Sequence, residues 1–244
     1  MEKDSNNAKN KKLKCLKVYD QLYELIQNGT YPPGSQLPSE TILAKQMNVS
    51  RMTLRKTLSF LWEDGLIKNV QGVGHFVIDQ TKKISNDMEK KVLLHPVYSY
   101  CTEKLDSVEM NFHIEPPRKS MTDSLQQYTA AVVTVDRWYK AKDVPLAYSL
   151  SFIPIELIGK KQIDLNHKEQ LLNYLESQCY QETEHCHRLC SYSDAGNFTA
   201  ATYKLSNEDS FLLVQETIYD SDENILISNK HYIPFNLFKI EIHF

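Results

Sequence analysis

The stretch VSRMTLRKTLSFLWEDGLIKNVQGVGHFVI, residues 49–78, decides the fold of the first part of the chain. Apolar side chains recur in it at helical spacing, which predicts a helix with one buried face. Ser50 is the expected N-cap of this helix, and Gly65 is the expected stop at its C-terminal end. Two short runs around Gln71-Gly72-Val73-Gly74 then predict a β-hairpin. The buried stripe of the helix is predicted to be Leu54, Leu58, Leu61 and Trp62.

Two further helices are predicted upstream of this stretch. Val18, Leu22, Leu25 and Ile26 lie on one helical face, and Asn28-Gly29 ends that helix. A second helix is expected to begin at Pro38-Ser39-Glu40, with Glu40 in the first turn, where the helix dipole favours an anion. Three helices followed by a hairpin predict a winged helix-turn-helix over residues 15–78.

The exposed side chains of the third helix suit contact with DNA. Arg51 and Arg55 are one helical turn apart and so project from one side. Arginine pairs with O6 and N7 of guanine in the major groove, and the free amides of a helix N-terminus bind phosphates. Two arginines on a solvated helix face and glycines in a plain tight turn are the alternatives. The predicted DNA-contacting set is Ser50, Arg51, Thr53, Arg55, Lys56, Lys68, Gln71, Gly72 and Gly74.

The distribution of charge suits a DNA-binding N-terminal domain, called the head, followed by a second domain with another function. Residues 1–78 hold 11 Lys and Arg against 7 Asp and Glu, whereas residues 79–244 hold 17 against 24. Residues 1–14 are Lys- and Asn-rich and are expected to form a disordered basic arm, and residues 79–92 are expected to be a linker. The chain has no apolar run of the roughly 20 residues that span a bilayer and no apolar leader. We therefore expect a cytoplasmic protein without membrane contact.

The second part of the chain is predicted to be an α+β domain over residues 93–244. Apolar or alternating runs at 129–139, 146–153, 211–219 and 225–233 predict strands, and 167–178 predicts a helix between them. The expected sheet is mostly antiparallel. The fold class is thus α+β, with an N-terminal winged helix-turn-helix.

Residues 18–78 resemble the DNA-binding domain of the GntR-like transcription regulators. The resemblance rests on Leu37-Pro38-Ser39-Glu40, Val49-Ser50-Arg51, Thr53-Leu54-Arg55, Gly65-Leu66-Ile67 and Gln71-Gly72. It implies that Ser50, Arg51, Thr53, Arg55, Gln71 and Gly72 contact DNA. One position departs from the family, because Thr41 stands where an arginine is common, and this suggests an altered operator preference.

Residues 93–244 are similar to the UTRA sensor domain of the HutC-type branch of that family, which shares its fold with chorismate lyase. The similarity rests on Arg137-Trp138-Tyr139, on residues 144–154 from Val-Pro-Leu-Ala to the closing Pro, and on Tyr232. It implies a pocket for a small effector, a sugar phosphate or another metabolite. The predicted effector-binding set is Arg137, Tyr139, Ser149, Ser151 and Tyr232.

Three departures alter the expected ligand. Amino-sugar-phosphate sensors of this branch carry a second arginine where this chain has Tyr139, and glutamates where it has Ser149 and Ile227. The pocket is therefore expected to be less charged and more aromatic. Arg137 has an alternative role as the ion-pair partner of Asp136 or Asp143.

A group of cysteines and histidines, Cys179, His185, Cys186, His187 and Cys190, admits a metal or redox hypothesis. Its spacing is not that of a zinc finger, and buried thiols in a β-core are the default expectation, so no metal and no cofactor are predicted. The lyase-like fold suggests an enzyme, but residues 93–244 show no nucleophile motif and no Gly-rich nucleotide loop. The predicted function is a homodimeric repressor that binds pseudo-palindromic double-stranded operator DNA under the control of a small effector. A DNA-binding protein whose second domain only dimerises, or senses redox state or metal, is the alternative.

Overall fold

The chain divides into two compact units, Met1–Met88 and Glu89–Phe244, in the computed structural model of the protein. The structure describes residues 2–70, 72–78, 94–183 and 185–240, with the side chains of residues 2–11 left aside. Gln71 and the predicted linker 79–92 lie outside the described residues. In the described part of the chain, no helix is long and apolar enough to cross a membrane.

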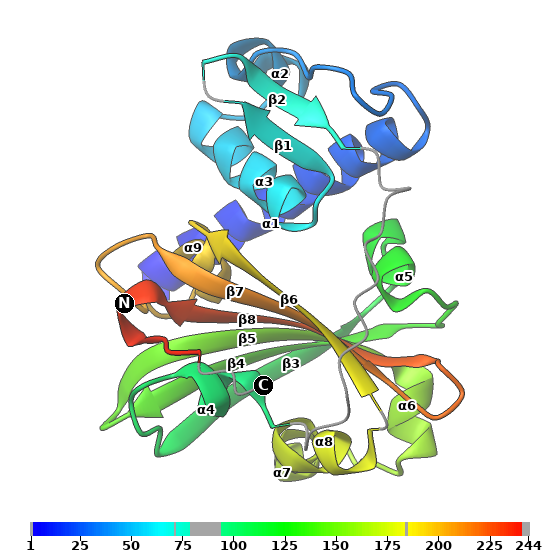
Figure 1. Cartoon of the computed structure of the whole chain (residues 1–244), viewed down its shortest axis with the longest axis vertical. Helices are drawn as coiled ribbons and strands as arrows, with labels where there is room; N and C mark the ends of the chain where they lie inside the picture. Colours follow the sequence, from blue (N-terminus) through cyan, green and yellow to red (C-terminus); the bar gives the residue numbers. More distant parts are fainter. Residues whose placement is uncertain (1, 71, 79–93, 184, 241–244) are drawn as a thin grey trace. The chain divides into compact units, whose positions relative to one another are not determined.

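The first unit has the predicted order of three helices and a hairpin (Figure 1). Its elements are α1 (Glu2–Gln27), α2 (Glu40–Gln46), α3 (Arg51–Glu63), β1 (Ile67–Val70) and β2 (Gly74–Val77). The core contains Val18, Leu22, Leu54, Leu58 and Leu61, as their helical spacing predicts. Trp62 departs from that stripe, because its side chain is 37% exposed.

The prediction of a disordered arm over residues 1–14 was wrong, since α1 already begins at Glu2. The helix is anchored by Cys15, Val18 and Leu22, which are buried in the unit. The Thr57 hydroxyl donates to the Cys15 carbonyl at 3.3 Å, and this bond ties α1 to α3. Extending an existing helix fixes one residue for each new hydrogen bond, so a polar segment without glycine or proline continues the helix upstream.

The second unit is built on one six-stranded antiparallel sheet with the order β3-β4-β5-β8-β7-β6. Arg137 of β4 lies opposite Ser149 of β5, and Ser149 lies opposite His231 of β8. Because side chains alternate across a strand, this register places all three on one face of the sheet. The strands are β3 (Ser107–Glu115), β4 (Val132–Ala141), β5 (Val144–Pro154), β6 (His185–Ser193), β7 (Phe211–Tyr219) and β8 (Ile225–Pro234).

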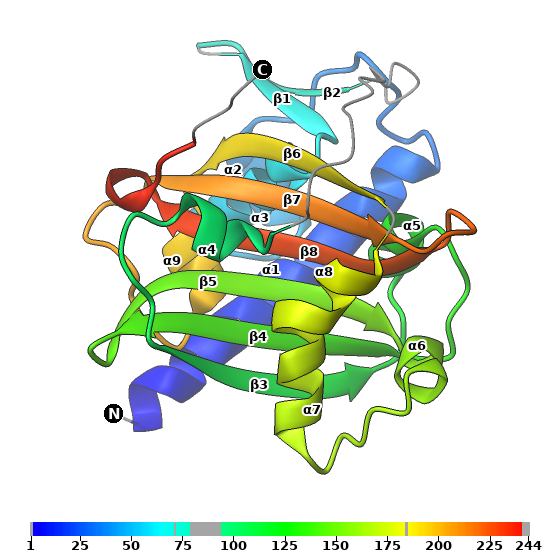
Figure 2. The ribbon, with the colours of Figure 1, turned by 60° about the horizontal axis from the view of Figure 1, so that its bottom comes forward.

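Helices cover both faces of this sheet (Figure 2). The face that carries Arg137 packs against Tyr174, Leu175 and Tyr180, and against α4 through Val97. The opposite face packs against α9 through Ala200 and against α5. The helices are α4 (Pro96–Tyr100), α5 (Lys119–Leu125), α6 (Ile155–Lys160), α7 (Lys168–Asn173), the π-helix Tyr174–Gln178, α8 (Cys179–Glu182), α9 (Gly196–Ala200) and the 3₁₀ turn Phe235–Leu237.

The predicted α+β class and mostly antiparallel sheet agree with this architecture. The four predicted strands correspond to β4, β5, β7 and β8. The helix predicted at 167–178 differs in one respect, because it changes from α to π geometry at Tyr174 and returns to α geometry at Cys179. This wider turn carries Glu176 toward the sheet, where it meets Arg137.

Candidate functional site

The N-terminus of α3 presents exposed polar groups above a buried apolar face. Ser50 is the N-cap, and its hydroxyl accepts from the Thr53 amide at 3.2 Å and pairs with the Thr53 hydroxyl at 2.9 Å. Arg51 and Arg55 are exposed, whereas Leu54 is fully buried. The cap fixes the start of the helix, so the two arginines hold a defined spacing on its solvent side.

Arg55 is held by an acidic side chain from α2. Its Nε donates to Glu40 Oε2 at 2.7 Å, and Glu40 Oε1 lies 3.8 Å from Nε2 of His75 on the hairpin. Glu40 therefore links α2 to α3 and orients one of the two predicted base-contacting arginines. From the sequence, Glu40 was expected only to interact with the helix dipole. By contrast, Arg51 forms no ion pair with any residue in the described ranges.

The remaining predicted DNA contacts fall in different surroundings. Lys68 is exposed on β1, while Lys56 is half-buried and its charge lies near the thiol of Cys15. Thr53 is half-buried and its hydroxyl is bonded to Ser50. The structure therefore keeps Lys68 available at the surface and turns Lys56 toward α1.

The wing turn has the glycine geometry that its sequence predicts. Gly72 and Gly74 have φ values of +76° and +131°, which L side chains rarely adopt. A Cβ on Gly74 would lie 3.0 Å from Gln36 Nε2, which donates to the Val73 carbonyl at 2.7 Å. The turn is thus fixed from the side by Gln36, and the backbone at its tip is left uncovered.

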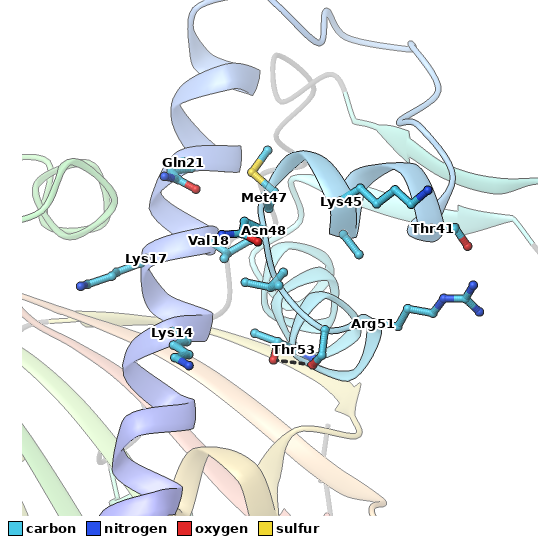
Figure 3. A pocket seen from close by; sticks show the side chains of 13 residues that line it. Lys14, Lys17, Val18, Gln21, Thr41, Lys45, Met47, Asn48, Arg51 and Thr53 are labelled. Carbon is cyan, nitrogen blue, oxygen red and sulfur yellow. Dashed lines mark hydrogen bonds between the residues drawn. The ribbon is translucent and has the colours of Figure 1, made fainter.

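A shallow groove of about 900 Å³ lies between α1, α2 and the start of α3 (Figure 3). Among the residues that the structure describes, its lining has four cationic side chains, Lys14, Lys17, Lys45 and Arg51, and no carboxylate. Figure 3 shows Lys45 and Arg51 extending to one side of the groove and Lys17 to the other. A basic surface of this kind attracts phosphate oxygens. Met52, 65% exposed beside Arg51, adds an apolar side chain of the kind that contacts the thymine methyl group.

The second unit contains a buried polar cluster centred on Arg137, which is fully buried. Its Nη1 donates to Glu176 Oε1 at 2.5 Å, and its Nη2 donates to the Ser151 hydroxyl at 2.7 Å. The Ser151 hydroxyl donates in turn to Asn229 Oδ1 at 2.5 Å. The alternative partners Asp136 and Asp143 are not used, since the carboxylate that meets Arg137 comes from the π-helix.

Tyr139 connects this arginine to His95 at the start of α4. The Tyr139 hydroxyl lies 3.0 Å from His95 Nε2 and donates to Glu176 Oε1 at 2.9 Å. His95 Nδ1 accepts from the Val97 amide, so Nε2 carries the proton of the neutral ring and donates to Tyr139. Burial holds the pKa of His95 well below its usual value, and the charge of Arg137 lowers it further.

Glu216 is the second charged centre of the cluster and is also buried. It accepts from Tyr180 Oη and Arg188 Nε, both at 2.7 Å, from Asn229 Nδ2 at 2.9 Å, and from His231 Nε2 at 3.3 Å. Burial alone would raise its pKa, but the bond from His231 and the charge of Arg188 outweigh burial and lower the pKa of Glu216 to about 2. The cluster therefore contains two buried ion pairs, joined through Ser151 and Asn229.

Four of the five predicted effector residues lie together, and one does not. Arg137, Tyr139, Ser149 and Ser151 share a face of the sheet, where Ser149 pairs with His231 Nδ1 at 2.6 Å. Tyr232 is adjacent to His231 and so points to the opposite face, where it packs against Tyr148. Tyr232 therefore lies apart from the other four predicted effector residues. The other members of this cluster were not predicted from the sequence: Glu176, Glu216, Asn229, His231, Arg188, Tyr180 and His95.

A cavity of about 380 Å³ reaches the cluster from outside. Tyr98, Leu172, Asn173 and Glu176 are among its lining residues, while Arg137 is not. Glu176 therefore lies at the boundary between the cavity and the buried arginine. This arrangement gives a small molecule a path toward the cluster.

Residues 14–77 match the family described as "Bacterial regulatory proteins, gntR family", and residues 108–239 match the UTRA domain. The chain belongs to the GntR family of bacterial regulators with a UTRA domain. The predicted resemblance to the HutC-type branch of this family is confirmed. The predicted linker, residues 79–92, lies between the two matched ranges.

Named relatives agree with this membership. The chain is 30% identical over 151 residues to the HTH-type transcriptional repressor NagR of Bacillus subtilis, covering 59% of this chain and 58% of the relative. It is 41% identical over 63 residues to the histidine utilization repressor of Pseudomonas aeruginosa, covering 26% of this chain and 25% of that protein. The chain thus matches about a quarter to three fifths of the length of these relatives. A solved structure, the possible transcriptional regulator YydK from Bacillus subtilis, has a TM-score of 0.45 and 16% identity, and covers 95% of this chain and 99% of its own.

The cysteines and histidines of the UTRA domain do not form a shared site. In the described ranges, no three His, Cys, Asp or Glu side chains come together in an arrangement that could hold a metal ion. Cys179 is buried, and burial raises the pKa of the Cys186 thiol to about 11. His185 stacks on Tyr219 with ring centroids 4.7 Å apart. Thiols with raised pKa values react slowly with oxidants, which counts against the redox hypothesis.

We expect Glu40→Gln in this GntR regulator to weaken discrimination between operator and random DNA. Arg55 would lose the carboxylate that orients it, while the head would lose one negative charge, so binding to random DNA should strengthen. The preference for operator is expected to fall about fivefold, the low end of what losing a base-contacting arginine costs. Fluorescence anisotropy on both DNAs at one salt concentration measures this ratio.

Glu24→Gln is the matched control for Glu40→Gln. Glu24 is exposed on α1 and carries the same charge, so its replacement changes the net charge equally. It is expected to strengthen binding to both DNAs and leave their ratio unchanged. An equal ratio for the two variants would show that Glu40 acts by charge alone.

The UTRA domain is expected to lose stability as the pH falls below about 6.5, the usual histidine value. Burial lowers the pKa values of His95 and His231, so both rings are neutral in the folded state and bind protons more readily once unfolded. Protonation therefore favours unfolding below the unfolded-state pKa. The stability is expected to fall again below about pH 4.5. There the Glu216 carboxylate binds a proton in the unfolded state but stays ionised in the folded state.

Urea unfolding at pH 7.5, 6.5 and 5.5 tests the first loss. Trp62→Phe leaves Trp138 as the fluorescent reporter of the UTRA domain, because the chain has two tryptophans. A free energy of unfolding that stays constant between pH 7.5 and 5.5 would contradict the buried neutral histidines.

Proposed function

We propose that the chain is a cytoplasmic transcriptional repressor whose binding to operator DNA is controlled by a small effector. The observation that carries the proposal is the exposed pair Arg51 and Arg55 on a Ser50-capped helix, in a chain that belongs to the GntR family. A helix with its opposite face buried can enter the major groove and present those guanidinium groups to guanine. Lys68, Gly72, Gly74 and the cations of the groove between α1 and α3 would contact phosphates.

The effector site of this proposal is the cluster around Arg137, Tyr139, Ser149 and Ser151. It lies in the part of the chain that matches the UTRA domain. A cavity adjoins the cluster. Its polar groups come from five strands, the N-cap of α4, the π-helix and α8, so a ligand there would contact several elements at once. The effector acts only by binding one arrangement of the protein better than another.

The regulator is proposed to act as a homodimer on a pseudo-palindromic site, with one head for each half-site. The relative NagR is named as a repressor, and this supports repression as the sign of regulation. The relatives named for histidine utilization and fructoselysine utilization match over 63 and 69 residues, so they support the DNA-binding function and leave the effector open.

Anisotropy titration of the full chain onto DNA from upstream of its own gene tests the proposal. Sequence-specific binding that weakens with rising salt is expected, and one member of a metabolite panel should change the affinity. A palindromic footprint and a dimer by sedimentation would support the assembly. Equal affinity for this DNA, for sites selected from a random pool and for random DNA would remove the proposal.

A further inference from the structure

The carboxylate that neutralises Arg137 is supplied by an unusual local structure. Glu176 lies in the single-turn π-helix Tyr174–Gln178, between α7 and α8. Such turns are rare, and those that occur are frequent at functional sites. The Glu176 side chain is 13% exposed and borders the external cavity, whereas Arg137 behind it is 0% exposed. Glu176 is therefore placed to be moved without opening the sheet.

Glu176 uses the arginine incompletely. Arg137 Nη1 and the Tyr139 hydroxyl both donate to the same oxygen, Oε1. Arg137 Nε is buried and has no hydrogen-bond partner among the residues that the structure describes. A guanidinium offers parallel donors that match both oxygens of a carboxylate, and burying a donor without a partner is costly. A free carboxylate in the place of Glu176, unconstrained by the helix, could accept from Nη1 and from the Tyr139 hydroxyl through separate oxygens, whereas Glu176 uses one oxygen for both.

The charges of the cluster limit what could take that place. Arg188 is already paired with Glu216 at 2.7 Å. Burial lowers the pKa values of His95 and His231 and keeps both rings neutral. If Glu176 leaves, one unit of positive charge remains, on Arg137. That charge matches a monoanion, because the second negative charge of a phosphate monoester would be buried without a partner.

We propose that Glu176 occupies the anion site of Arg137 as an internal ligand, and that the effector is a small molecule with a single carboxylate that displaces it. This inference rests on the proposed role of the Arg137 cluster as the effector site. The carboxylate of the effector accepts from Arg137 and Tyr139, and Glu176 moves toward the cavity. Occupancy of the site is thereby linked to the conformation of residues 168–182.

The entrance is compatible with an anion. Asp106 and Glu169 also line the cavity, and both are exposed, so solvent and salt screen their charges. Asp106 is further bonded to the amide of Lys142 at 2.8 Å. The buried charge of Arg137 is screened far less. The site therefore favours an anion once the anion has passed the mouth of the cavity.

Replacing the internal carboxylate by an external one tests the inference in the full chain. Glu176→Ala in a Trp62→Phe background removes the internal ligand and leaves Trp138 to report unfolding of the UTRA domain. The probes are sodium acetate, methyl phosphate and methylammonium chloride, compared with sodium chloride at equal ionic strength. Acetate at 100 mM is expected to raise the unfolding midpoint of the variant by roughly 3–5 °C, as for a site that is about tenfold above its dissociation constant.

The control variants show whether the response to acetate comes from the site that Glu176 leaves. Acetate should leave the midpoint of the parent chain and of Glu208→Ala unchanged, because Glu208 is an exposed carboxylate of the same domain that does not line the cavity. Glu176→Gln keeps the shape of the side chain and should respond to acetate less than Glu176→Ala. It also serves as the test if Glu176→Ala does not fold. A larger response to methyl phosphate or methylammonium than to acetate, or an equal response of parent and variant, would overturn the inference.

The inference and the proposed function fail separately. If no probe stabilises the variants while a metabolite still changes operator binding, the internal-ligand inference is wrong and the repressor proposal stands. If acetate restores Glu176→Ala but the chain binds no operator, the carboxylate site is supported and the proposed function is wrong.

Discussion

Glu216→Gln is expected to lower the free energy of unfolding of the UTRA domain by about 3–5 kcal/mol, the usual cost of breaking a buried ion pair from one side. The carboxylate accepts from four side chains, and the amide would present a donor to groups that already donate. Arg188, only 18% exposed, would lose its charged partner. The effect should therefore exceed that of any single neutral hydrogen bond in the domain.

Urea unfolding followed by Trp138 fluorescence measures this loss at pH 7.5. Glu182→Gln is the control, because Glu182 pairs with Lys161 at the surface of the same domain. An exposed pair contributes at most about 1 kcal/mol, so the control should remain close to the parent. If both variants lose the same amount, Glu216 is not the centre of a buried network. The slope with urea concentration should stay constant, since the surface exposed on unfolding is unchanged.

The elements of the head were predictable because each leaves a local pattern. Ser50 before an apolar stripe and Gly65 after it mark the limits of α3, and paired glycines mark the wing. The structure differs from the prediction at the N-terminal end of α1, where the sequence has no helical pattern of apolar residues. Residues 1–14 show no apolar periodicity, so nothing in them indicates that α1 extends upstream from its buried anchor at Cys15.

The polar cluster around Arg137 was only partly predictable, because its members are far apart in sequence and because strand register decides which face each side chain takes. Arg137 and its carboxylate Glu176 are 39 positions apart, and no spacing rule selects Glu176 over the nearby Asp136 and Asp143. Tyr232 lies on the face opposite to Arg137, because neighbouring residues of a strand point to opposite faces of the sheet. The register of β5 with β8 decides between His231 and Tyr232, and that register depends on the whole sheet.

The two arginines of α3 are expected to differ in how they lose DNA affinity. Arg55→Ala and Arg51→Ala should each cost about 1–3 kcal/mol in operator binding, if each reads a base. Arg55 is already oriented by Glu40, so it should read its base with little loss of side-chain freedom. Arg51 forms no ion pair in the described part of the chain, so it should contribute more to the salt dependence.

Anisotropy titrations on operator and random DNA at several salt concentrations separate these roles. Lys68→Ala is the control for a phosphate contact, because Lys68 is exposed on β1 of the wing and should weaken binding to both DNAs equally. If Arg55→Ala behaves like Lys68→Ala, then Arg55 contacts phosphate, and the Glu40 pair does not serve base recognition. If Arg55→Ala lowers operator binding alone, and Glu40→Gln lowers it in the same direction to a smaller extent, the carboxylate acts through the arginine. The double variant then decides the point, since Glu40→Gln should have no further effect on discrimination once Arg55 is absent.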